Sequence, residues 1–305
     1  MADPPPGAER DYPLARLTTI RTGGAADLFA RPGSLVELER LLTWAASEDV
    51  QVGVVGSGSN LLIADAGVRG LVLKLDKELS KIELDGTRLT CGGGARLPAV
   101  SARAAQAGLE GLEFGVNIPG TVGGAVRMNA NAYGGELARV LDWVDVVSDR
   151  GTERRAPGEL GFRYRASSLG PAEVVAQAGF VLERSDPGRV KATLADMRAR
   201  RKAAQPGGIK TFGSTFKNPD DPRAEDRTAG QLLDAAGARG LRVGGASFAA
   251  KHANFIVNEG DATTADVIAL MAEGRRLVKE RFGVELEPEV QTLGDVEIPP
   301  EWSSG

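Results

Sequence analysis

Three glycine-rich segments have the composition of loops that bind a phosphate group. They are Gly56–Asn60, Cys91–Gly94 and Ile118–Ala125. Backbone N–H groups in such loops can converge on a pyrophosphate without a cationic side chain, and a helix N-terminus adds a partial positive charge. Each segment alone is also what a tight turn requires. Three of them beside predicted strand ends favour a bound dinucleotide.

The glycine pattern differs from the two common nucleotide-binding motifs. Gly56 and Gly58 are followed by Leu61, where a G-x-G-x-x-G fingerprint needs its third glycine. The chain also lacks a G-x-x-x-x-G-K-[ST] phosphate loop. Composition alone does not identify the ligand.

Several side chains could act on a substrate, and each also has an ordinary structural explanation. Ser214 follows a glycine and fits a turn. Arg165 lies in an arginine-rich stretch, where a solvated surface charge is the default. Glu287 and Glu289 would face the same way in a strand unless Pro288 separates them.

Composition excludes several classes of protein. The 305-residue chain has one cysteine, Cys91, and one histidine, His252, so it can form no intrachain disulfide, and a zinc site of histidine and cysteine is not expected. We expect both residues to be structural. A net charge of −4 argues against nucleic-acid binding, and no apolar run is long enough to span a membrane. A cytoplasmic monomer that binds neither nucleic acid nor membrane is expected.

The hydrophobic pattern predicts three structured stretches after a proline-rich, disordered tail of residues 1–16. The first, residues 17–76, has strands in 26–31, 50–55 and 70–75 and a capped helix in 35–46. The second, residues 77–185, has a hairpin around Asp85-Gly86, further strands in 143–148 and 174–183, and a helix in 97–107. The third, residues 186–305, has a basic helix in 189–204 and a capped helix in 264–282 that Gly283 ends.

The motifs together, over about residues 17–293, resemble the UDP-N-acetylenolpyruvoylglucosamine reductase family. The matching segments, in order, are Arg21–Ala26, Gly56–Leu62, Ile118–Ala125 with Asn129 and Ala130, Gly213–Pro219, Ala229–Leu233, Lys251–Asn258 and Leu286–Val290. The segment after Tyr164-Arg165-Ala166-Ser167 is short, which resembles the compact subtype that lacks an extra substrate-covering loop.

The resemblance implies an α+β fold: a vanillyl-alcohol-oxidase-type FAD-binding unit of two α+β subdomains (17–76 and 77–185) and a C-terminal α+β substrate domain (186–305). It also implies FAD as cofactor, NADPH as co-substrate and a UDP-linked amino sugar as substrate. The residues implied to bind FAD are Gly56, Ser57, Gly58, Ser59, Asn60, Leu61, Pro119, Gly120, Thr121, Gly123, Gly124, Ala125, Asn129 and Ala130. Those implied to contact the substrate are Tyr133, Tyr164, Asn218, Gln231 and Asn254.

The implied reaction reduces an enolpyruvyl group, which needs three functions from the protein. A cation must hold the carboxylate, a group must stabilise the enolate, and a donor must protonate the α carbon. By the resemblance these are Arg165, Glu289 (with Glu287 as the competing carboxylate) and Ser214. If Gly213–Asn218 is a strand, Asn218 shares a face with Ser214, whereas Lys217 points to the other face.

Two other functions remain compatible with the sequence. One is a flavoenzyme of the same fold that oxidises an alcohol or hydroxy acid, although such enzymes often tether flavin through His, Cys or Tyr, for which few candidates exist here. The other is a non-catalytic protein that binds a nucleotide sugar.

Overall fold

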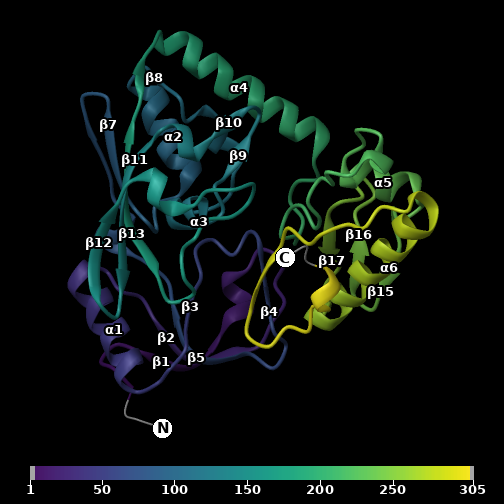
Figure 1. The fold of residues 1–305 in the computed structure, drawn as a ribbon, viewed down its shortest axis with the longest axis horizontal. Helices are drawn as coiled ribbons and strands as arrows, with labels where there is room; N and C mark the ends of the chain where they lie inside the picture. Colours follow the sequence, from purple (N-terminus) through teal and green to yellow (C-terminus); the bar gives the residue numbers. More distant parts are fainter. Residues whose placement is uncertain (1–3, 303–305) are drawn as a thin grey trace. The chain divides into compact units, whose positions relative to one another are not determined.

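The structure of the chain is a computed structural model that describes residues 4–302. It contains two compact units (Figure 1). The first comprises the described residues up to Asp11 together with Asp27–Ser57 and Gly70–Arg201, and the second comprises Tyr12–Ala26, Gly58–Arg69 and the described residues from Lys202 onward. Helices and strands occur in both units, so the expected α+β class is confirmed. The division at residues 76 and 185 stays a prediction.

The first unit is built around a five-stranded antiparallel sheet. In spatial order its strands are β12 (Gly151–Arg155), β11 (Leu141–Ser148), β13 (Val174–Val181), β7 (Arg88–Gly92) and β6 (Ile82–Asp85). Helix α1 (Leu35–Ser47) packs with Val174 and Ala176 of β13. Helices α2 (Leu97–Gln106) and α3 (Val122–Arg127) pack with Val175, because successive strand residues point to opposite faces. The central strand β13 is therefore buried on both faces, whereas the edge strands β12 and β6 are partly exposed.

A smaller sheet brings a glycine loop to a strand end. Its order is β1 (Glu9–Pro13), β2 (Ala25–Ala30), β5 (Val68–Leu73) and β3 (Val52–Val54). Strands β3 and β5 are parallel, so their carboxyl ends meet at the same edge. Gly56 follows β3 and Lys74 follows β5, so both lie at this edge.

Three more elements complete the first unit. They are the two-stranded ladders β9 (Asn131–Ala132) with β10 (Gly135–Glu136) and β8 (Leu109–Glu110) with β14 (Glu183–Arg184), and helix α4 (Pro187–Ala204), of which all but the last turn belongs to this unit.

The second unit has its own core around a three-stranded sheet. The strands are β15 (Arg242–Val243), β16 (Ala246–Phe248) and β17 (Ile256–Asn258), and the covering helices are α5 (Ala229–Ala235) and α6 (Thr264–Phe282). In the same unit β4 (Leu61–Ile63) pairs in parallel with β18 (Gln291–Leu293). This pairing joins segments from opposite ends of the chain.

Most locally signalled elements are confirmed. Ser34 accepts a hydrogen bond from the Glu37 amide at the start of α1, and α6 ends at Gly283 with a left-handed φ of 69°. The predicted disordered tail is wrong for Glu9–Arg16, which form β1 and a following 3-10 turn, because strand pairing stabilises a segment whose composition favours disorder. Residues 1–3 of that tail lie outside the described residues. Over residues 4–302 no helix is long and apolar enough to cross a membrane.

Candidate functional site

In the second unit, backbone hydrogen bonds align four predicted site segments side by side. The Thr215 amide donates to the Asn254 carbonyl at 2.8 Å, and the Glu289 amide donates to the Thr215 carbonyl at 2.8 Å. The Asn60 side chain then donates from Nδ2 to the Glu289 carbonyl at 3.0 Å. The first glycine loop, the Ser214 segment and the Glu289 segment thus form one continuous ladder.

The Ser214 segment is extended but is not the regular strand that the sequence prediction assumed. Only isolated bridges form, from Ser214 to Phe255 and from Phe216 to Pro288. Thr215 and Phe216 are consecutive and both fully buried, so the two-residue alternation fails, and Gly213 has a φ of +89°. Because the segment is not a regular strand, strand alternation does not place Asn218 and Ser214 on one face.

Asn218 and Gln231 both contribute to the start of helix α5. Asn218 Oδ1 accepts from the Ala229 amide at 3.2 Å, and Gln231 Oε1 accepts from the Thr228 amide at 2.8 Å in a capping box. The side-chain oxygen of each residue therefore already has a structural role as the acceptor for a backbone amide. A substrate contact by either residue stays a prediction.

The two candidate carboxylates have different surroundings. Glu287 Oε2 lies 3.1 Å from Lys217 Nζ, in a pair whose side chains are about one-third exposed or less. Glu289 is the residue whose backbone adjoins Thr215 and Asn60. Lys217 therefore holds the Glu287 carboxylate in an ion pair, and which of the two carboxylates acts in the reaction stays a prediction.

His252 lies in a turn before β17. Its Nδ1 accepts from the Asn254 amide at 3.3 Å, and its ring packs edge-on against Phe255. Burial lowers the pKa of His252, and the Arg239 charge lowers it further. These contacts agree with the expected structural role.

In the first unit, the predicted flavin loops meet. Ser57 Oγ donates to the Pro119 carbonyl at 2.5 Å. The amide of Gly123 donates to the Gly93 carbonyl at 2.7 Å, so the third glycine segment joins the same cluster. A Cβ on Gly56 would lie 2.4 Å from Thr121 Oγ1, which shows how closely the loops approach. Cys91, the first residue of the segment Cys91–Gly94, is fully buried, and burial raises the pKa of its thiol to about 12.

Three cations near these loops were not identified from the sequence. Burial lowers the pKa of the Lys74 ammonium, and the charges of Arg31 and Arg96 lower it further, while Asp76 opposes them. Lys74 Nζ donates to the Gly56 carbonyl, and Arg96 Nη2 to that of Pro119 at 3.5 Å. Like charges gathered at a half-buried site favour an anion. The sequence placed Arg31 and Lys74 near the ends of the predicted strands 26–31 and 70–75 and Arg96 two residues after Gly94, which alone did not mark them as site residues.

Arg165 occupies the tip of a tight turn. Arg163 and Ala166 form an isolated bridge beneath it, and Arg165 itself has a φ of 56°. Its Nη1 donates to the Asn131 carbonyl at 3.1 Å, and its guanidinium lies 5.4 Å from the centre of the Tyr164 ring. Arg165 is half-buried and held in place, rather than a freely solvated charge.

The neighbouring surface is a pocket of about 390 Å³. It is lined by Asn131, Ala132, Tyr133, Gly134, Gly135, Glu136, Arg139 and Tyr164. Tyr133 and Tyr164 are 45% and 49% exposed, and Tyr133 Oη accepts from Asn117 Nδ2 at 3.2 Å. Two exposed aromatic rings beside Arg165 suit a ligand with a flat ring and an acidic group.

Comparisons with known proteins identify the family. Residues 205–293 match the family model described as the C-terminal domain of UDP-N-acetylenolpyruvoylglucosamine reductase. The chain is 44% identical over 287 residues to UDP-N-acetylenolpyruvoylglucosamine reductase 2 of Symbiobacterium thermophilum, which covers 93% of this chain and 92% of the relative. The chain belongs to the UDP-N-acetylenolpyruvoylglucosamine reductase family. A second reductase of that name, from Sphingopyxis alaskensis, is 46% identical over 290 residues, covering 93% and 94% of the two chains.

A solved structure of the family has the same fold. The crystal structure of the reductase from Thermus caldophilus superposes with a TM-score of 0.81 at 37% identity, covering 94% of this chain and 98% of that one. Residues 26–156 match a family model described as an FAD binding domain. This member of the reductase family therefore carries an FAD-binding domain, and FAD is its cofactor.

The residues present fit a flavin dinucleotide. At Gly120 and Gly124 a Cβ would make only ordinary contacts with the protein, at 3.7 and 3.5 Å, so packing alone does not require glycine there. A ligand that approaches the backbone closely does require it. The cluster of Arg31, Lys74 and Arg96 supplies positive charge that suits a pyrophosphate.

Proposed function

We propose that this chain, with FAD as cofactor and NADPH as electron donor, reduces the enolpyruvyl group of UDP-N-acetylglucosamine enolpyruvate to give UDP-N-acetylmuramate, a peptidoglycan precursor. The observation that carries the proposal is the ladder in which the Ser214 segment is hydrogen-bonded between Asn254 and Glu289, with Asn60 of the first glycine loop on the far side of Glu289. These hydrogen bonds support the proposal because they hold the segments of the proposed proton donor, carboxylate and flavin loop beside one another. When bound, FAD supplies the hydride chemistry.

The proposed roles follow from the charges of the reaction. Arg165 binds the substrate carboxylate, because its planar fork suits two parallel hydrogen bonds. Ser214 gives a proton to the α carbon as negative charge develops there, and the ladder holds the backbone that carries this side chain. Glu289 stabilises the intermediate or exchanges the proton. Lys217 neutralises Glu287 and keeps that carboxylate out of the reaction.

The glycine segments have the proposed task of holding the cofactor. The residues proposed to contact FAD are Gly56 to Leu61, Pro119 to Thr121, Gly123 to Ala125, Asn129 and Ala130. Tyr133 and Tyr164 contact the nucleotide sugar. Residues 17–76 and 77–185 are the proposed FAD-binding subdomains and residues from 186 onward the substrate domain. We also propose a cytoplasmic monomer.

Separate half-reactions test this function. Purified protein is reduced anaerobically with NADPH and then mixed with UDP-N-acetylglucosamine enolpyruvate while the flavin absorbance is followed. Rapid return of the oxidised spectrum is expected. Flavin that stays reduced would indicate another substrate, and protein without flavin would contradict the function altogether.

The Ser214→Ala variant tests the proton donor in the same assay. Reduction by NADPH should stay nearly unchanged, and reoxidation by the sugar should slow by roughly 100-fold or more. Ser47→Ala, at an exposed helix end, is the matched control and should behave as the wild type. Equal loss of both half-reactions in Ser214→Ala would mean that Ser214 is structural.

A further inference from the structure

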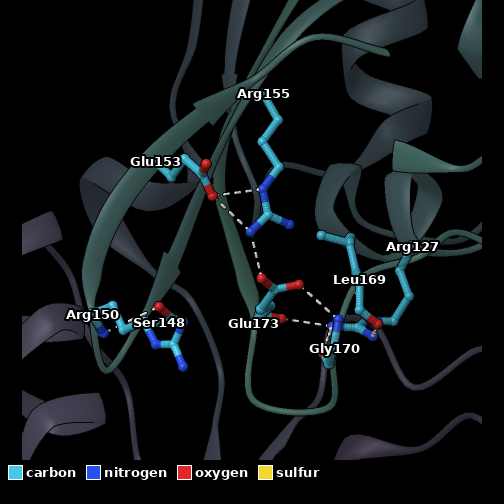
Figure 2. A network of polar contacts seen from close by, with 8 residues as sticks. All are labelled: Arg127, Ser148, Arg150, Glu153, Arg155, Leu169, Gly170 and Glu173. Atoms are coloured by element: carbon cyan, nitrogen blue, oxygen red, sulfur yellow. Dashed lines mark hydrogen bonds and ion pairs between the residues drawn. The ribbon is translucent and has the colours of Figure 1, made fainter. Parts of the chain in front are cut away.

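Arg127 links helix α3, which begins within the glycine segment Ile118–Ala125 and is called here the flavin-loop helix, to the loop that carries Arg165. It is the last residue of α3, and its guanidinium donates to three backbone carbonyls of one loop (Figure 2). Nη1 reaches the carbonyl of Leu169 at 3.2 Å, and Nη2 reaches those of Gly170 at 3.0 Å and Glu173 at 2.6 Å. Three acceptors along five residues fix the path of the chain there.

The far end of the same loop is tied to the five-stranded sheet. The Glu173 carboxylate accepts from the Gly170 amide at 2.7 Å and from Arg155 Nη2 at 2.5 Å, and Arg155 in turn pairs with Glu153 at 2.8 Å (Figure 2). Hydrogen bonding to Arg155 is the main reason that the pKa of Glu173 is lowered. The side chains of Arg155 and Glu173 are only 20% and 22% exposed, so this pair is shielded from solvent more than a surface ion pair.

The near end of the loop is held by the residues that follow Arg127. Asn129 Nδ2 donates to the Arg163 carbonyl at 3.3 Å. The Asn131 carbonyl accepts from Arg165 Nη1 at 3.1 Å. The short segment 127–131 therefore contacts the loop 163–173 at both ends and at Arg165 itself.

The backbone of Arg165 needs this support. A φ of 56° is uncommon for a residue other than glycine, and such a conformation persists only where the surroundings hold it. Arg127 is suited to holding it, because a guanidinium presents several donors in a fixed plane. Burial lowers the pKa of Arg127 and the Glu173 charge opposes this, so the group is half-enclosed beside its counter-charge.

We propose that Arg127 is a positioning residue that holds the loop 163–173 against the flavin-loop helix and so fixes Arg165 for the substrate carboxylate. The inference depends on the role proposed above for Arg165. It assigns to Arg127 no contact with substrate or FAD. Lysine at position 127 would keep the charge but could not reach three carbonyls in one plane.

Kinetics with Arg127→Met and Arg127→Lys test the proposal. Both variants should keep their FAD content and their rate of reduction by NADPH, while the KM for UDP-N-acetylglucosamine enolpyruvate rises about tenfold, with Arg127→Lys no better than twofold improved over Arg127→Met. Arg154→Met is the matched control, since Arg154 pairs with Asp145 on the same sheet but is 58% exposed. It should leave the KM unchanged.

A double-mutant cycle separates positioning from general support. In an Arg165→Met background, Arg127→Met should raise the KM no further, because the group that it positions is gone. Additive effects, or parallel loss of FAD and of NADPH oxidation, would overturn the proposal in favour of a structural role. If Arg165→Met alone leaves the KM unchanged, the role of Arg165 fails, and the inference fails with it.

Hydrogen exchange gives a readout that does not depend on activity. Amide exchange at Ala166 and Gly170, whose N–H groups donate within the loop, should speed up in Arg127→Met but not in Arg154→Met. Faster exchange with an unchanged KM in Arg165→Met would place the failure in the function proposed for Arg165. Unchanged amide exchange in Arg127→Met would contradict the proposal that Arg127 holds the loop 163–173 in place.

Discussion

The side-chain amide of Asn254 pairs with both backbone groups of Phe216. Asn254 Oδ1 accepts from the Phe216 amide at 2.9 Å, and Nδ2 donates to the Phe216 carbonyl at 2.9 Å. Asn254 is 4% exposed and Phe216 fully buried, so no water competes for these bonds. The side-chain amide thus makes the two hydrogen bonds that the backbone of a neighbouring strand would make. It thereby holds the segment that begins at Ser214. The structure supports a bracing role for Asn254, and its predicted contact with the substrate stays a prediction.

Asn254→Ala should therefore both destabilise the protein and slow reduction of the sugar. Two buried backbone groups would lose their partners, at about 1–3 kcal/mol each, so we expect a loss of about 3 kcal/mol in unfolding free energy. Denaturant unfolding measures this loss in the free energy of unfolding. Asn254→Asp keeps one acceptor but puts a buried carboxylate oxygen against the Phe216 carbonyl, so it should destabilise the protein at least as much as Asn254→Ala. Unchanged stability in Asn254→Ala would contradict the bracing role.

The acting carboxylate can be identified by two conservative substitutions. Glu289→Gln should slow single-turnover reoxidation by the sugar by roughly 100-fold or more, because the acid–base or electrostatic group is lost. Glu287→Gln should change that rate by much less, because Glu287 is paired with Lys217. A larger effect at Glu287 would reverse the assignment.

Lys74 should contribute to FAD affinity through its charge. Replacing it by Met removes one of three clustered cations, and we expect the Kd of apoprotein for FAD to rise about tenfold, or about 1.4 kcal/mol. The salt dependence of binding should also weaken, since screening acts on the lost charge. Lys81→Met, at an exposed ion pair with Glu78, is the control. Equal affinities in the two variants would count against a pyrophosphate beside Lys74.

His252 should make the protein less stable in mild acid. Its folded pKa is lowered by burial and by Arg239, and Asp234 only partly opposes them. Above the ordinary pKa of 6.5 the ring is neutral in both the folded and the unfolded chain, so its titration does not lower the free energy of unfolding. As the pH falls through 6.5 towards the lowered folded pKa, the unfolded chain binds the proton first, so the free energy of unfolding decreases.

Comparison with His252→Gln isolates this effect. Unfolding free energies of the two proteins, measured from pH 7.5 to 4.5, should diverge below pH 6.5 because only the wild type carries the histidine term. Parallel curves would mean that His252 titrates alike in the folded and unfolded chain.

Local sequence signals were sufficient to predict the elements that depend on neighbouring residues. The capping residues Ser34 and Thr263, the Asp85-Gly86 turn and Gly283 fix helix and strand ends, because their hydrogen bonds and φ values are local. The ordered motifs also indicated the family, and through it the cofactor and a set of residues that stay predicted to bind it. The kind of reaction was therefore predictable from the sequence without knowledge of the fold.

Tertiary structure decided which distant groups meet. Asn60 and Glu289 are 229 positions apart, and their contact follows from the parallel pairing of β4 with β18, which no local signal encodes. The same holds for Arg127, which resembles any helix-end arginine until the loop before β13 folds against it. Strand order and long-range burial depend on how whole elements pack, and packing likewise broke the alternation expected around Ser214.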